Sequence, residues 1–324
     1  MMETSSPPYR TTELPISMRI IPVFTALIGI FATITNSLSL SYFITKIRSK
    51  SPATRNADKL ITPKLFLVLN IFDLLVTVSA TVCFCAIPTK QHLLQVISEN
   101  ILYVLVMMTS FLTCLLAAVR AINLILTFYI INWGFVKVSI YVYSLYIVVF
   151  ELMLISFQYS AELKSLEKKL YCVEFFTLVS LFSVVVVSNL LAIGKLFISK
   201  SQTQTWKTTR KATVTVGILS VIYCVCNIGY IVIHGLNRFS TFKVLRSIPI
   251  ELGDTFLYIL LPLNSACNPA VYLIRKADMR THLKTLWRRL TGWIIALCVS
   301  SKWADKRAVQ TRRGSWLHRS LESP

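Results

Sequence analysis

The sequence predicts an all-α membrane protein, a bundle of seven transmembrane helices followed by an amphipathic helix in the membrane interface. Hydrophobic residues make up 55% of the 324 residues and charged residues only 15%, whereas a soluble domain carries about 25% charge. The apolar residues gather in seven blocks, and the basic residues gather in alternate segments between them. These three observations exclude a disordered chain and disfavour a water-soluble globule.

Each apolar block reaches the length of about 20 residues that crosses roughly 30 Å of hydrocarbon as a helix. A helix satisfies its backbone hydrogen bonds internally, as the lipid interior requires, and few blocks show the two-residue alternation of a barrel strand. In chain order the blocks are residues 20–45, 65–88, 94–126, 138–157, 175–198, 212–235 and 250–274.

Two of these blocks contain an acidic residue. The third block is longer than a span requires and includes Glu99, so we expect its outer end to project into water or to tilt. The fourth block includes Glu151, and hydrocarbon tolerates such a side chain only when it faces the interior of a bundle. The fourth block is therefore the least regular span.

The distribution of Lys and Arg predicts the orientation of the chain. Positive charge is enriched in cytoplasmic loops. The richer set of connecting segments holds 23 of the 34 basic residues and comprises 46–64, 127–137, 199–211 and 275–324. The opposite set holds 9 and comprises 1–19, 89–93, 158–174 and 236–249. The richer set is expected in the cytoplasm.

Three regions follow from this orientation. Residues 1–19 form an extracellular tail, residues 20–274 form the membrane domain, and residues 275–324 form a basic cytoplasmic tail. The net charge of +20 then belongs mostly to surfaces that face anionic lipid. No nucleic-acid partner is needed to explain the charge.

The tail contains a pattern typical of a helix that lies in the interface. Its apolar positions are Leu283, Leu286, Trp287 and Leu290, and its basic positions are Arg280, Lys284, Arg288 and Arg289. Further on, Cys298 is a candidate for palmitoylation, and an unmodified buried thiol is the alternative.

Polar side chains inside the apolar blocks are candidates for function. Placing Asp or Arg at the centre of a membrane helix costs about 2.5–3.5 kcal/mol, so such residues face the bundle interior and have partners. Asn36 lies in the first block, Asp73 in the second and Arg120 in the third. The seventh block ends with a cluster of polar residues between 264 and 268.

These positions, taken in order, resemble those of the rhodopsin-like (class A) G-protein-coupled receptors, as a divergent member. The resemblance covers residues 20 to about 290, and its most specific part is Asn268-Pro269-Ala270-Val271-Tyr272, which is similar to the NPxxY motif. Asn36 resembles the first-helix asparagine, Asp73 the second-helix aspartate and Arg120 the arginine of the DRY motif.

The resemblance implies two groups of functional residues. Asn36, Asp73, Thr109, Asn264, Ser265 and Asn268 would form a polar core, in which a bound sodium ion neutralises Asp73. The alternative is a water-filled polar cluster that only fixes packing. Arg120, Pro269 and Tyr272 would form an activation switch, because a proline allows its helix to bend. No other cofactor or metal is expected.

Departures from the family pattern bear on coupling and on the disulfide. Val119 and Ala121 flank Arg120 where the family has an acidic residue and a tyrosine, so we expect raised basal activity. The sixth block also lacks the family's tryptophan and proline. A bridge between Cys85 and Cys172 would resemble the family's outer disulfide, and a free Cys172 is the alternative.

The resemblance places a ligand cavity at the outer end of the bundle. The ligand, a small molecule or a peptide, is of unknown class, although Leu102 disfavours a biogenic amine because the aminergic family has aspartate there. Glu99, Glu174, Glu251 and Asp254 would ring the cavity mouth and favour a cationic ligand or a basic peptide, or they would form a solvated rim. The candidate lining residues are Glu99, Leu102, Tyr103, Met107, Tyr230, His234, Glu251, Asp254 and Tyr258.

The expected function is therefore that of a multi-pass plasma-membrane receptor that passes an extracellular signal to heterotrimeric G proteins. A signalling-silent heptahelical scavenger and a transporter are the alternatives. An enzyme is not expected, because the sequence contains no HExxH, GxSxG or GxxxxGK[ST] motif and its four histidines are scattered.

Overall fold

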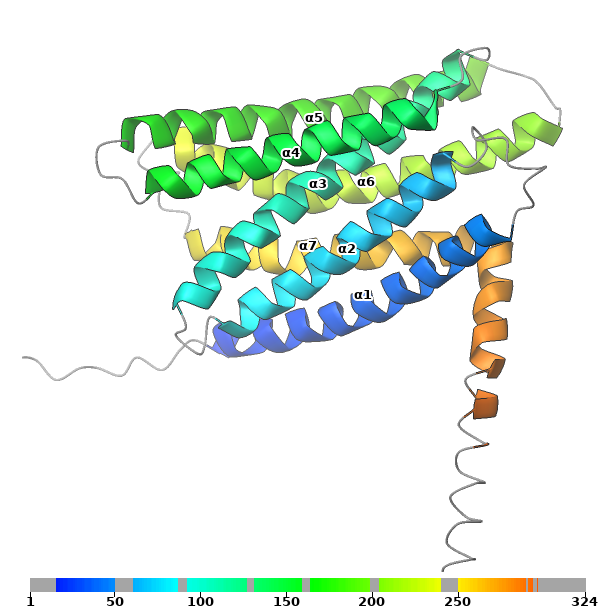
Figure 1. The fold of residues 1–324 in the computed structure, drawn as a ribbon, viewed down its shortest axis with the longest axis horizontal. Coiled ribbons are helices and arrows are strands. Elements are labelled where there is room, and N and C mark those ends of the chain that lie inside the picture. Colours follow the sequence, from blue (N-terminus) through cyan, green and yellow to red (C-terminus); the bar gives the residue numbers. More distant parts are fainter. Residues whose placement is uncertain are drawn as a thin grey trace, which may run out of the picture. The chain divides into compact units, whose positions relative to one another are not determined.

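The computed structural model describes seven long helices between Ile16 and Arg275 (Figure 1). In chain order they are α1 (Ile16–Arg48), α2 (Ile61–Ala86), α3 (His92–Ile125), α4 (Trp133–Gln158), α5 (Lys164–Ile198), α6 (Gln204–Phe239) and α7 (Ile250–Arg275). The described residues are 16–49, 61–86, 92–126, 131–158, 164–198, 204–239, 250–289, 291–293 and 296. Within them the all-α prediction is confirmed.

The predicted blocks fall on these helices, with two clear differences at the ends. α5 begins at Lys164 and α6 at Gln204, whereas the apolar blocks begin at residues 175 and 212. The residues added to α5 are rich in Lys, Glu and Leu, and those added to α6 include three basic residues. Lys, Arg, Glu and Leu favour helix. Hydropathy marks the part of a helix that suits hydrocarbon, and the helix itself continues beyond it.

Five helices are long and apolar enough to cross a membrane, judged on the described residues alone. Their candidate spans are Val23–Arg48, Ile61–Val82, Asn100–Ile125, Trp133–Ser156 and Lys169–Ile198. In α6 the described side chains give an apolar stretch over Thr213–Gly229, and the side chains on either side of it, at 212 and 230, lie outside the described residues. These lengths support a membrane protein with several transmembrane helices.

The helices pack in a closed order. Each helix from α1 to α7 contacts the next one, and α1 also contacts α7. α3 is the central helix, because it contacts α2, α4, α5 and α6, while α2 and α7 also touch. Figure 1 shows α3 running obliquely between α4 and α2. α1, α2 and α7 therefore form one group of mutual neighbours.

The polarity of α1 is the reverse of that in a water-soluble protein. Asn36 and Ser39 are buried, while Leu27, Phe31 and Ile34 are exposed on the opposite side of the helix. A soluble helix turns its polar residues toward solvent. The exposed apolar face of α1 is therefore suited to contact with lipid hydrocarbon.

Glu151 has a buried position in α4 that explains how an acidic residue fits a membrane helix. Its side chain is 5% exposed, and Glu174 on the neighbouring α5 is 3% exposed. Both carboxyl groups thus avoid the lipid-facing surface. The expectation that Glu174 belongs to a solvated rim is wrong, because α5 begins before it and turns it inward.

The chain divides into two compact units, Met1–Arg275 and Lys276–Pro324. In the second unit, residues 277–289 are helical, as the spacing of apolar and basic residues predicts. Trp287 lies on this helix and is exposed. An exposed tryptophan among basic residues is typical of a helix in the membrane interface.

Candidate functional site

Asp73 is the centre of the candidate site. It lies midway along α2 and its side chain is 1% exposed. The Asn268 amide on α7 donates a hydrogen bond from Nδ2 to Asp73 Oδ2 at 2.6 Å, and the Ser265 side chain hydrogen-bonds the same carboxyl group. The predicted polar core thus joins α2 and α7 through side chains 195 residues apart in sequence.

Asn36 connects α1 to the same region of α7. Its Nδ2 donates to the backbone carbonyl of Ala32 at 2.9 Å and to that of Ser265 at 3.1 Å. In a regular helix the N–H of residue 269 would donate to the Ser265 carbonyl. Because Pro269 has no N–H, that carbonyl lacks its helical donor, and Asn36 supplies one from another helix.

The polar core contains more hydrogen-bond acceptors than donors. Asn36 Oδ1 and Asn264 Oδ1 are buried and have no partner among the described residues, and the Asp73 carboxyl group adds two oxygens. Thr109, also buried, donates its hydroxyl to the Val106 carbonyl of its own helix at 2.9 Å. An excess of buried oxygens suits a cation or ordered water.

The described residues contain no group of three or more His, Cys, Asp and Glu side chains that would bind a metal. A cation in the polar core would therefore be held by one carboxylate and neutral oxygens. Such ligands fit a hard monovalent cation, since the hard cations take oxygen ligands and a soft transition metal takes sulfur or imidazole.

Arg120 lies near the C-terminal end of α3 and is partly buried. Its Nε is buried without a hydrogen-bond partner in the described part of the chain. The flanking Val119 and Ala121 are buried, and Ala121 packs with Leu124 and Ala192 of α5. The residues beside Arg120 are thus packing residues, and none of them offers a charge.

Tyr272 is fully buried in an aromatic cluster with Phe43 and Phe66. Its ring centroid lies 5.5 Å from that of Phe43 on α1 and 4.7 Å from that of Phe66 on α2, both in edge-on geometry. Phe43 and Phe66 stack at 5.6 Å. The cluster therefore closes one end of the interface between α1, α2 and α7.

Phe43 and Phe66 were not predicted as site residues. One signal in the sequence could have indicated them: Phe43 lies near the C-terminal end of α1, as Tyr272 does in α7, and Phe66 lies near the N-terminal end of α2, which runs the opposite way. The hydrogen bond from Arg275 Nε to Thr215 Oγ1 at 3.0 Å was also not predicted. This bond joins α7 to α6, and Arg275 lies three residues after Tyr272 in the sequence.

Three of the predicted ligand-cavity residues have described side chains. Leu102 is buried in a cluster with Val76, Ala80 and Leu261, and Met107 is buried against Ile147 and Leu178. Tyr103 packs against the second of these clusters. These side chains fill contacts between helices, and their role in ligand binding stays a prediction. The side chains that lie outside the described residues are Glu99, Tyr230, His234, Glu251, Asp254 and Tyr258.

Of the three cysteines named in the predictions, only Cys172 has a described side chain. Cys172 lies on α5 with a free, half-buried thiol. The side chain of Cys85 and the whole of Cys298 lie outside the described residues. The alternative of a free Cys172 is the one present in this structure.

No protein-family model matches this chain, and no curated protein matches it. A functional interpretation therefore depends on the arrangement of the polar core and the aromatic cluster.

Proposed function

We propose that this protein is a rhodopsin-like G-protein-coupled receptor that crosses the plasma membrane seven times. The observation that carries the proposal is the pairing of Asp73 with Asn268, directly beside Pro269 and the buried Tyr272. A buried charge in hydrocarbon costs free energy, so its position next to a helix-bending residue suggests a functional role.

The proposed switch is a movement of α7 at Pro269 that changes the packing of Tyr272. In the state described, Tyr272 packs on Phe43 and Phe66, and this packing holds α7 against α1 and α2. A bend at Pro269 would withdraw Tyr272 and open the end of the bundle near Arg120, where a G protein binds. An extracellular ligand would favour the open state through its higher affinity for it.

A sodium ion in the polar core would favour the closed state. Its charge would neutralise Asp73, and the free amide oxygens of Asn36 and Asn264 are acceptors suited to it. Removal of the ion would leave the Asp73 carboxylate to protonate or to find another partner. Ion release and α7 movement would thus be coupled.

The proposed orientation has the N-terminus outside and the C-terminus in the cytoplasm. It is supported by the excess of Lys and Arg in alternate connecting segments. The end of the bundle that carries Arg120 and Tyr272 would then face the cytoplasm, since α3 and α7 both end there.

A panel of G-protein reporters in cells that express the full chain tests this function without a known ligand. We expect a basal signal above that of empty vector, because Val119 leaves Arg120 without an adjacent carboxylate. Arg120→Ala should return the signal to the vector level. Lys195→Ala is the matched control. It removes a positive charge from α5 at the end of the bundle that also carries Arg120, and it should preserve the signal.

Two outcomes would contradict the receptor. One is the absence of signal in every reporter although antibody labelling shows the wild-type protein at the cell surface. The other is an Arg120→Ala variant that signals as the wild type does. Ion-dependent solute uptake by the same cells would instead favour a transporter.

A further inference from the structure

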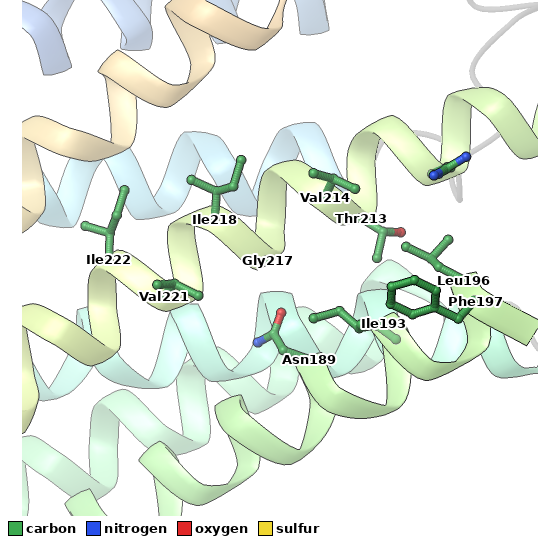
Figure 2. Close-up of a pocket in the computed structure, with 12 residues that line it drawn as sticks. Asn189, Ile193, Leu196, Phe197, Thr213, Val214, Gly217, Ile218, Val221 and Ile222 are labelled. Carbon is green, nitrogen blue, oxygen red and sulfur yellow. The ribbon is translucent and has the colours of Figure 1, made fainter.

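A groove between α5 and α6 is unrelated to the polar core. It has a volume of about 460 Å³ and lies between the C-terminal half of α5 and the N-terminal half of α6 (Figure 2). Ile193 and Phe197 line it from α5, while Val214, Ile218 and Val221 line it from α6. Phe197 is 84% exposed, so the groove opens on the outer surface of the bundle.

The apolar lining of the groove favours a hydrocarbon chain as its ligand. Both walls lie on apolar stretches, since α5 contributes a candidate membrane span and α6 contributes the stretch Thr213–Gly229. A water-soluble ligand would have to displace lipid to reach it. A flexible chain that is already in the membrane fills the same volume with no new desolvation cost.

One end of the groove carries positive charge. Arg210 is part of the lining, and Arg210 and the adjacent Lys211 are both exposed. From Arg210 to Ile222 the groove follows thirteen residues of α6, which rise about 18 Å along the helix axis. That is slightly more than half of the roughly 30 Å hydrocarbon core, which is the depth of a single lipid leaflet.

We propose that this groove binds an anionic phospholipid, with its phosphate on Arg210 and one acyl chain along α6 between Val214 and Val221. The charge at the mouth, the apolar walls and the leaflet-deep length all match a lipid of this class. A zwitterionic lipid has the same acyl chain but a weaker attraction to an arginine at the surface. The inference rests on membrane insertion and does not require signalling activity.

A larger side chain at Gly217 would fill the groove, so a substitution there tests the proposal. It lies in the lining, and a Cβ at this position would approach nothing nearer than Asn189 Oδ1 at 3.8 Å, an ordinary contact. Gly217→Leu should therefore fold and occupy the space of the chain. Gly229→Leu is the matched control on the same helix, because a Cβ there meets nothing within 4 Å and Gly229 is not part of the groove.

The experiment measures lipid retained by the full chain. The protein is reconstituted in nanodiscs of phosphatidylserine and phosphatidylcholine in equal parts with identical acyl chains, and retained lipids are counted by native mass spectrometry. We expect preferential retention of phosphatidylserine, lowered about five-fold by Arg210→Gln and largely lost in Gly217→Leu. Gly229→Leu and Lys137→Gln, which removes an exposed charge from α4, should retain it as the wild type does.

The proposal is overturned if Arg210→Gln and Gly217→Leu both retain phosphatidylserine as the wild type does. It is also overturned if Lys137→Gln lowers retention equally, since that would indicate a general effect of net charge, or if phosphatidylcholine is retained equally. Gel filtration of each variant verifies folding, and Arg210→Gln alone decides the result if Gly217→Leu aggregates, because Arg210 is exposed.

Discussion

At the scale of single residues, the carboxyl group of Asp73 determines what the polar core can bind. It is buried on α2 and shares hydrogen bonds with Ser265 and Asn268 of α7. Two amide oxygens of the predicted polar core, those of Asn36 and Asn264, are buried and have no donor within the described residues. A cation satisfies such oxygens together, whereas each water would need donors and acceptors of its own.

We expect sodium to stabilise the purified protein through this carboxylate. At a sodium concentration ten times its dissociation constant, the free energy of unfolding should rise by about 1.4 kcal/mol. The measurement compares thermal unfolding midpoints in sodium chloride and choline chloride at equal ionic strength. Asp73→Asn should abolish the difference, and Glu151→Gln, at a buried carboxyl group outside the polar core, should preserve it. Equal wild-type midpoints in the two salts would argue against the ion.

At the scale of helices, the contact between α1 and α7 depends on an interrupted helical hydrogen bond. Pro269 leaves the Ser265 carbonyl without its regular donor, and Asn36 donates to that carbonyl from α1 at 3.1 Å. A buried carbonyl without a partner costs about 1–3 kcal/mol. The proline in one helix and the asparagine in the other are therefore a matched pair.

A double-mutant cycle tests this pair. We expect Asn36→Ala to lower the free energy of unfolding by about 1–3 kcal/mol in the wild type and by about 1 kcal/mol less in a Pro269→Ala background, where residue 269 regains an N–H. The measurement is equilibrium unfolding in mixed detergent micelles. The control is Asn189→Ala, because the Asn189 amide donates to Val185 of its own helix. An equal cost of Asn36→Ala in both backgrounds would show that Asn36 does not compensate for Pro269.

At the scale of the whole molecule, polarity is arranged to suit a bilayer. Asn36, Asp73 and Asn268 are buried, and the exposed faces of α1, α4 and α5 carry large apolar side chains. In α6 and α7 the longest runs of described side chains, Thr213–Gly229 and residues 259–275, are too short for a span length to be judged on them. The apolar blocks 212–235 and 250–274 are why we propose that α6 and α7 span the membrane together with the five helices whose described residues already reach that length.

The sequence predicted the helices and the central pair of the site for a clear physical reason. Hydrocarbon penalises polar groups so strongly that Asp73 and Asn268 could be recognised as interior residues before any contact was known. The bond from Asn36 to the Ser265 carbonyl was not predicted, because it depends on the rotation of α1 against α7. Leu102 and Met107 were assigned by depth to a ligand cavity, and depth does not distinguish a cavity wall from a packed interface.

The proposed receptor requires an odd number of membrane spans, because only an odd number places the two ends of the chain on opposite sides of the membrane. Epitope tags at the N-terminus and the C-terminus of the full chain, probed by antibodies in intact and permeabilised cells, measure this directly. We expect the N-terminal tag to be labelled in intact cells and the C-terminal tag only after permeabilisation. Labelling of both tags in intact cells, or of neither tag before permeabilisation, would place both ends on one face and contradict the seven-helix receptor.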